Sequence, residues 1–249
     1  MNSIILCEGS TDYVLLQYFM RVANGWQEDR SKQQNLFKFD KQSSRKLFQG
    51  DSSLTIAAVG GSSRITEGLS NVLLRNSLVP PTSENDFFDK IVVLTDRDEI
   101  NTESELIRKI EDVFNANQVV SSAVLNHNSW IKCSMQSRAG VRKEFEILVL
   151  IIPFEECGAM ETFLLKAIAQ KDVYDGNIIN QCNSLVDTVD PERKYLNKRR
   201  LITKAKFDTY FSIRTSAAQF VERQDILKNV NWEEYEAIQK QFVLLKELT

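Results

Sequence analysis

Histidine and paired cysteines are scarce in this sequence, and each scarcity excludes a class of chemistry. The 249 residues contain a single histidine, His127, which largely excludes Ser–His–Asp triads and histidine-based metal sites. The four cysteines include no Cys-x-x-Cys pair, which argues against a zinc site and against a disulfide framework. Any catalysis must therefore use carboxylates, lysines or hydroxyls.

Long apolar runs are also missing. No run approaches the roughly 18 residues that a membrane-spanning helix needs. The chain starts directly with a strand-like segment, with no basic leader or signal-peptide cleavage pattern before it. We therefore expect a cytoplasmic protein that does not enter a membrane. The net charge of −3 excludes a generally cationic protein, so a nucleic-acid surface would have to be local.

The first half of the chain alternates strand-like and helix-like patterns. This alternation predicts an α/β fold, with a mostly parallel sheet flanked by helices. A polar, lysine-rich stretch over residues 25–53 is interpreted as a long excursion between elements. The predicted strands are 3–7, 54–59, 90–95, 119–125, 130–135 and 144–152, and the predicted helices are 11–23, a segment after Gly61, and 102–116.

The pattern changes near residue 158, after which nearly everything is typical of helix. We predict an α/β core over residues 1–157 and a helical C-terminal part over 158–249 that packs on the core. A final helix is predicted where apolar residues recur at helical spacing, namely Tyr235, Ile238, Phe242 and Leu245.

Acidic residues follow two of the predicted strands. Glu8 follows the first strand in CEGSTD, and Asp96 and Asp98 follow the third in LTDRD. Because ligands gather at the carboxyl ends of parallel strands, these acids are expected to meet. Two carboxylates about 4 Å apart repel by roughly 4 kcal/mol at an effective dielectric near 20, so a divalent cation is the natural occupant. Asp12 has an equally good structural explanation, in which Ser10 or Thr11 caps a helix and Asp12 complements its dipole.

CEGSTD and LTDRD resemble the two hallmark motifs of the Toprim domain, which is shared by topoisomerases, bacterial primases and OLD-family nucleases. The VGG at 59–61 fits the second strand end of that family, and GAMETFLL at 158–165 is similar to its Gly-x-x-Glu helix start. The resemblance covers roughly residues 1–170 and implies a Toprim, Rossmann-like fold that binds Mg²⁺ or Mn²⁺. The metal-side acids implied by the resemblance are Glu8, Asp12, Asp96, Asp98 and Glu161.

Several branches of that family do not fit. A topoisomerase needs a large additional domain with a strand-cleaving tyrosine, and a primase brings a zinc module that these cysteines cannot build. An OLD nuclease carries its own ATPase, yet no G-x-x-x-x-G-K-[ST] loop occurs here. The chain therefore resembles stand-alone, OLD-like Toprim nucleases, which often stand beside a separate ATPase in phage-defence systems. That analogy implies an ATPase partner.

A basic segment, residues 193–206, contains no acidic residue. It is either a solvated helix face or a surface that neutralises phosphates. OLD-like nucleases also use a lysine downstream of the acids, and we prefer Lys206 to Lys204 for that catalytic role. The residues predicted to bind nucleic acid are Lys198, Arg199, Arg200 and Lys204.

Three functions remain open. The first is a metal-dependent nuclease that acts on phosphodiesters, with DNA favoured over RNA, in which Glu8, Asp96, Asp98 and Lys206 carry the catalysis; a homodimer is left open. The second is a catalytically weak Toprim subunit, regulatory or binding, that needs a partner. The third is a response-regulator-like or haloacid-dehalogenase-like domain. That third class requires an aspartate after an early strand, where this chain has Glu8.

Overall fold

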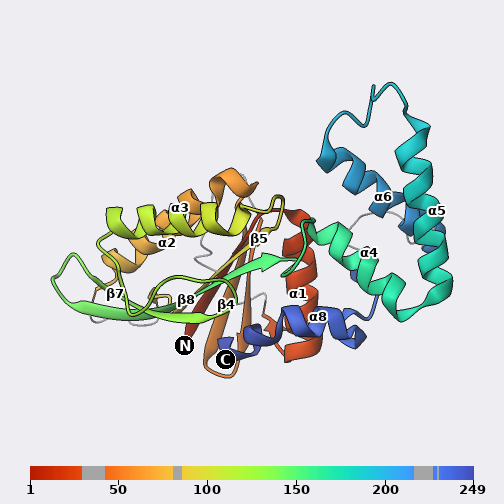
Figure 1. Ribbon diagram of the computed structural model, residues 1–249. Helices are drawn as coiled ribbons and strands as arrows, with labels where there is room; N and C mark the ends of the chain where they lie inside the picture. The colour runs from red at the N-terminus through yellow and green to blue at the C-terminus, as the bar shows by residue number, and fades with distance from the viewer. Residues whose placement is uncertain (30–42, 81–85, 216–226, 229) are drawn as a thin grey trace.

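One mixed β-sheet organises the molecule (Figure 1). This computed structural model describes residues 1–29, 43–80, 86–215, 227–228 and 230–249. Within them, eight strands lie in the order β2-β3-β4-β1-β5-β8-β7-β6. The strands are β1 (Asn2–Cys7), β2 (Gln27–Glu28), β3 (Ser44–Gln49), β4 (Ser52–Ala58), β5 (Lys90–Asp96), β6 (Val120–Ser121), β7 (Trp130–Gln136) and β8 (Arg142–Ile152).

The four central strands, β4, β1, β5 and β8, pair in parallel. They are rich in Ile, Leu, Val and Ala, as expected for strands buried on both faces. The pairs at both edges are antiparallel, with β3 and β2 beside β4, and β7 and β6 beside β8. The predicted α/β class is therefore confirmed, and the parallel arrangement holds for the centre of the sheet.

Helices cover both faces of this sheet and extend beyond the carboxyl ends of its parallel strands. In Figure 1, α2 and α3 lie over one face, α1 and α8 lie over the other, and α4, α5 and α6 stand beyond the strand ends. The helices are α1 (Ser10–Asn24), η2 (Ser62–Arg64), α2 (Ile65–Leu78), α3 (Thr102–Ala116), α4 (Met160–Lys171), α5 (Val173–Val189), α6 (Arg199–Arg214), η4 (Trp232–Glu234), α8 (Glu236–Gln241) and η5 (Val243–Leu248).

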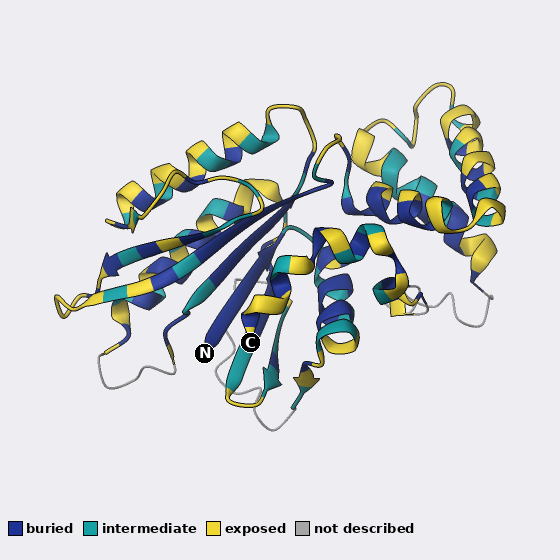
Figure 2. Cartoon of the chain, turned by 60° about the horizontal axis from the view of Figure 1, so that its bottom comes forward, coloured by how far each residue is buried: buried dark blue, intermediate teal, exposed yellow. Residues whose placement is uncertain are grey.

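The side chains of each central strand alternate between two hydrophobic clusters. In β1, Ile4 and Leu6 pack with α2 and α3, whereas Ile5 packs on the face that α1 covers. The second cluster continues through α4 and α6 to the C-terminal segment, so the helical part and the sheet share one buried core (Figure 2). The change of pattern near residue 158 corresponds to the step from β8 to α4.

Three predicted elements differ in detail. The final helix is divided into α8 and η5, although Ile238, Phe242 and Leu245 are buried as expected. Short successive turns give nearly the same spacing of apolar residues as one helix, so the pattern cannot distinguish them. The strand over 119–125 is reduced to β6, and the excursion over 25–53 contains β2 and β3, while its residues 30–42 lie outside the described part.

No helix in the described parts of the chain combines the length and the apolar character that crossing a membrane requires.

Candidate functional site

Glu8 stands at the carboxyl end of β1, where a double-glycine turn fixes its backbone. The Glu8 carbonyl oxygen accepts hydrogen bonds from the amides of Gly60 and Gly61, both at 2.9 Å. Gly61 has a φ of +126°, a conformation that favours glycine. The Glu8 carboxylate accepts hydrogen bonds from the Thr95 hydroxyl and, at 3.2 Å, from the Asp96 amide. Three neighbouring strand ends, those of β4, β1 and β5, are thereby tied together.

Asp96 ends β5 and also caps a helix from a distant part of the chain. Its Oδ1 accepts a hydrogen bond of 2.9 Å from the amide of Met160, the first residue of α4. The preceding residue, Ala159, provides no side-chain cap. A carboxylate in this position complements the positive end of the helix dipole. Asp96 is therefore held where the sheet meets the helical part.

Arg97 fixes the crossing of the two chain segments at this point. Its amide donates to the Ile152 carbonyl at 2.8 Å, and its own carbonyl accepts from the Gly158 amide at 2.8 Å. Its buried guanidinium donates to the Pro153 carbonyl and pairs with Glu103 at 3.1 Å. The residue between the two predicted aspartates therefore points into the protein and is structural, which leaves the aspartates on the outer side.

Two further acids come from the first turns of α1 and α4. Asp12, 4% exposed, accepts a 2.9 Å hydrogen bond from the Gly9 amide, so it serves as the local cap. Ser10 and Thr11 do not provide a side-chain cap for α1. The Thr11 hydroxyl instead donates to Glu161 Oε1 at 3.0 Å, and Glu161 is 6% exposed. The structural role expected for Asp12 is present, and the same side chain also faces the site.

All five predicted acids line one cleft, of about 580 Å³, at the carboxyl ends of the parallel strands. The double glycine after β4 and the start of α6 complete its walls. The charged residues that line the cleft are Glu8, Asp12, Asp96, Asp98, Glu99, Glu161, Arg199, Arg200 and Lys204. Side chains from segments far apart in the sequence thus meet in one place.

The crowding of acids in a buried place raises their proton affinity. The pKa of Asp12 is raised to about 7, mainly by burial and also by the negative charges of Glu8 and Glu161, while the hydrogen bond from Gly9 opposes the shift. Burial also raises the pKa of Asp96 well above its usual range, with the negative charges of neighbouring acids adding to the effect. The pKa of Glu8 is raised by burial too, although the hydrogen bond from Thr95 opposes that shift. The cleft therefore favours protons or cations.

The donor set fits a hard divalent cation. Every acid in the cleft offers carboxylate oxygens, the ligands that Mg²⁺ and Mn²⁺ prefer. Within the described residues, however, no three His, Cys, Asp or Glu side chains form a group ready to hold a metal ion. Each of Glu8, Asp12 and Asp96 accepts a hydrogen bond from the protein. A carboxylate has about four acceptor positions, so these bonds leave capacity for a cation.

Comparison with known proteins gives a family and a fold. A family model described as "Protein of unknown function (DUF3226)" matches residues 2–245. The chain belongs to the DUF3226 family. No curated protein sequence matches the chain. The crystal structure of the hypothetical protein PH0156 from Pyrococcus horikoshii OT3 is similar, with a TM-score of 0.53 and 17% identity over 99% of this chain and 91% of that one. This likeness supports the α/β fold.

In this DUF3226 protein the predicted basic residues divide into two groups. Arg199, Arg200 and Lys204 line the acidic cleft, and the Arg199 guanidinium donates to the Asp98 carbonyl. Lys198 precedes α6 and is exposed, and it is not among the residues that line this cleft. Lys206 lies in a neighbouring cleft and pairs with Asp187 at 2.8 Å. The structure therefore places Lys204, and not the preferred Lys206, beside the acids.

The sequence-based prediction missed the hydroxyls that support the acids in this DUF3226 protein. Thr95 donates to Glu8, and Thr11 donates to Glu161. Both residues stand inside the quoted motifs, CEGSTD and LTDRD, immediately before an acid. That adjacency was the available signal, but a buried threonine is also common in strands and helix starts, so it did not distinguish a supporting role.

Proposed function

We propose that this protein is a metal-dependent nuclease that hydrolyses phosphodiesters of nucleic acids, with Mg²⁺ or Mn²⁺ as cofactor. The observation that carries the proposal is the convergence of the five predicted carboxylates, from three separate segments of the chain, in one cleft that also contains three basic side chains. Such a cluster repels itself unless protons or cations are bound. Its acidic motifs also resemble those of Toprim domains, which act on nucleic-acid backbones.

Glu8, Asp96 and Asp98 would hold the cation, and Asp12 and Glu161 would support it. A bound cation would stabilise negative charge on a phosphoryl oxygen and lower the pKa of a water molecule bound to it. The chain contributes the arrangement of the ligands. Thr95 and the Asp96 amide orient Glu8, and the start of α4 orients Asp96. Fixed ligands of this kind cost little reorganisation when charge develops during a reaction.

The basic wall gives the phosphate a place to bind. Arg200 and Lys204 act on the acids across the cleft, since their positive charges lower the pKa values that burial has raised in Glu8 and Asp12 respectively. A phosphodiester that enters between the walls would meet acids on one side and cations on the other. Lys204 is the lysine placed to stabilise negative charge that builds up on the phosphate.

A cleavage assay with matched variants tests the proposal. Purified protein is incubated with plasmid, linear DNA and structured RNA, with Mn²⁺, with Mg²⁺ and with EDTA. We expect metal-dependent cleavage that Glu8→Gln and Asp96→Asn each reduce by roughly a thousandfold. Glu111→Gln, the same change on the exposed side of α3, should cleave like the wild type. Full activity in both Glu8→Gln and Asp96→Asn would refute the site.

A partner-dependent subunit is the competing function. In that case the isolated chain would not cleave under any metal condition, and activity would require complex formation with a separate ATPase. Titration of the metal-free protein with Mn²⁺, followed by thermal unfolding, separates this outcome from a misassigned site. If Mn²⁺ raises the unfolding temperature of the wild type but not of Glu8→Gln, the metal site is supported even though the isolated chain does not cleave.

A further inference from the structure

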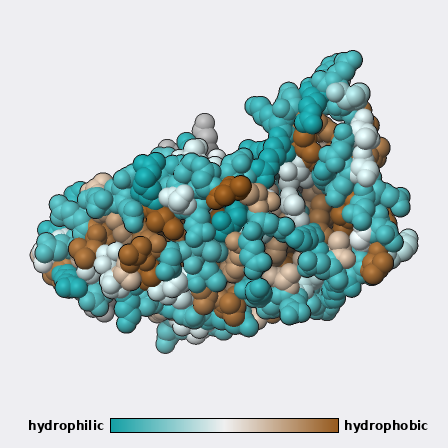
Figure 3. Space-filling model, in the orientation of Figure 1, coloured by the Kyte–Doolittle hydropathy of each residue, from teal (hydrophilic) through white to brown (hydrophobic). Residues whose placement is uncertain are grey.

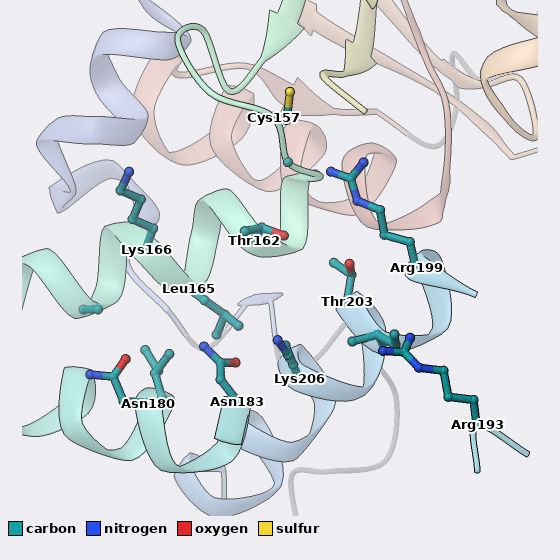
Figure 4. Close-up of a pocket in the computed structure, with 14 residues that line it drawn as sticks. Cys157, Thr162, Leu165, Lys166, Asn180, Asn183, Arg193, Arg199, Thr203 and Lys206 are labelled. Atoms are coloured by element: carbon teal, nitrogen blue, oxygen red, sulfur yellow. The ribbon is translucent and has the colours of Figure 1, made fainter. Parts of the chain in front are cut away.

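A second cleft, of about 630 Å³, lies directly beside the acidic one, between α4, α5 and α6 (Figure 4). The two clefts share Arg199 and Thr203, on the first turns of α6. A ligand that extends out of the acidic cleft past these two side chains would therefore enter the second cleft. The volume lies within the range of small-molecule sites, which is roughly 300–1,000 Å³.

The second cleft combines an apolar wall with a basic rim. Leu165, Ile179 and Ile202 come from three different helices and supply the apolar part. Figure 3 shows apolar atoms in the hollow that these helices enclose, with hydrophilic atoms around them. The basic side chains that line the cleft are Lys166, Arg193, Arg199 and Lys206.

The acids that pair with this rim are themselves exposed. Lys166 pairs with Glu156 at 2.5 Å and Lys206 with Asp187 at 2.8 Å, and about half of each acid's side chain is in solvent. Exposed ion pairs contribute little free energy, so a phosphate can replace these acids at small cost. The rim is therefore available to an anionic ligand.

Arg193 reaches the cleft from a built loop between α5 and α6. The Asp190 carboxylate accepts hydrogen bonds from the amides of Lys194, Tyr195 and Leu196, at 2.7–3.0 Å. These bonds fold the chain back, and Arg193 adopts a positive φ of 51° within that turn. In Figure 4 the Arg193 side chain extends toward Lys206 and Thr203. The loop thus holds the positively charged Arg193 side chain at the mouth of the cleft.

One polar atom in the cleft lacks a donor. Oδ1 of Asn183 is buried and has no hydrogen-bond partner among the described residues. Asn183 comes from α5 and lines the cleft opposite α4 (Figure 4). An unsatisfied buried acceptor is costly unless a ligand or water donates to it. The amino or imino edge of a nucleobase, or a sugar hydroxyl, has the donor that this atom needs.

We propose that the second cleft binds one nucleotide unit of a single-stranded nucleic acid, next to the phosphodiester held in the acidic cleft. The proposal rests on the nuclease function. The phosphate of the bound nucleotide lies against Arg193, Arg199 and Lys206, and its base lies on the apolar wall. A hydrogen-bond donor of the base or the sugar reaches Asn183. A base can make these contacts only when it is unpaired and unstacked, so the strand must be single at this point.

Binding in EDTA tests the proposal without cleavage. The affinity of a short, labelled single-stranded oligonucleotide is measured by fluorescence anisotropy for the full chain. We expect Arg193→Glu to weaken binding at least about tenfold, because it replaces a positive side chain that faces the phosphate with a negative one. Lys194→Glu is the matched control, since it makes the same charge change on the next residue, which does not line the cleft, and should alter affinity less than about threefold. Equal losses in both variants would overturn the proposal.

A second variant and two competitors define the ligand. Asn183→Leu should weaken oligonucleotide binding by roughly 3–10-fold, since it removes the acceptor from the cleft. A duplex of the same sequence should bind at least about tenfold more weakly than the single strand. Unchanged binding in Asn183→Leu, or equal affinity for the duplex, would overturn the assignment. So would competition by a free nucleoside monophosphate as strong as that of the oligonucleotide. Thermal unfolding of each variant checks that it is folded.

The same assay separates the two proposals. Glu8→Gln should bind the oligonucleotide in EDTA more tightly than the wild type does, because it removes a negative charge from the cleft. If the protein binds the single strand in preference to the duplex but shows no metal-dependent cleavage, the nuclease proposal is refuted and the nucleotide-binding proposal for the second cleft is retained. Cleavage that responds equally to Arg193→Glu and Lys194→Glu would keep the nuclease and refute the cleft.

Discussion

The acidic and basic walls of the candidate site are built in different ways. Glu8, Asp12 and Asp96 are buried or half-buried, and each accepts a hydrogen bond from a backbone amide. Arg199 and Arg200 are exposed and belong to one short stretch of α6. These three acids are thus fixed by the fold, whereas the two arginines project from a helix end. A rigid set of acids suits metal binding, and exposed cations suit an exchangeable, anionic ligand.

The largest contrast is expected between two lysines of the same helix. Lys204→Ala should lower kcat by about 10–100-fold, because it removes a positive charge beside the acids. Lys206→Ala should mainly raise KM, because this side chain lines the second cleft. Steady-state cleavage kinetics on one oligonucleotide distinguish the two effects. A larger loss of kcat in Lys206→Ala than in Lys204→Ala would support Lys206, which the sequence analysis preferred, as the catalytic lysine.

An intermediate effect is expected on the stability of the acidic wall. Asp12 has an ordinary pKa of 3.8 in the unfolded chain and about 7 in the folded protein. Between these two pKa values the folded state holds a proton that the unfolded state has lost. The free energy of unfolding therefore falls as the pH rises through this range, and the stability contributed by the bound proton is lost above about pH 7. In EDTA, Asp12→Asn should unfold at a temperature roughly 5 °C higher than the wild type at pH 8, and similarly to it near pH 4.

The side-chain amide that Asp12→Asn introduces keeps an acceptor oxygen for the Gly9 amide, so the cap is preserved. Added Mn²⁺ at pH 8 should stabilise the wild type more than Asp12→Asn, because the charge that attracts the cation is absent from the variant. Lower stability of Asp12→Asn at pH 8 in EDTA would show that the buried carboxylate is compensated by contacts other than a cation.

The smallest effect is expected at the rim of the basic wall. Glu99 pairs with Arg199 at 3.4 Å, and its side chain is 73% exposed. Glu99→Gln should leave the unfolding temperature within about 1 °C of the wild type, as an exposed ion pair stabilises little. The same variant should bind a single-stranded oligonucleotide about 2–3-fold more tightly, since it removes a negative charge near Arg199. Weaker binding would show that Glu99 orients Arg199 for its ligand.

Local sequence patterns were enough to predict the central strands and the convergence of Glu8, Asp96 and Asp98. Apolar strands followed by Glu8, and by Asp96 and Asp98, predict one cluster, because the carboxyl ends of parallel strands meet at one edge. The helix over 102–116 was likewise predicted from its local pattern. These features depend on short-range periodicity and on strand polarity, which a single sequence records.

Which side chains of the helical part face the acids depends instead on how the helices pack in three dimensions. Successive helical residues turn by about 100°, so Lys204 and Lys206 point to opposite sides of α6, and the packing of Phe207 and Tyr210 selects the side that meets the cleft. The approach of α4, which places Glu161 beside Thr11, likewise depends on contacts between segments 150 residues apart. Local sequence patterns contain no record of such distant contacts.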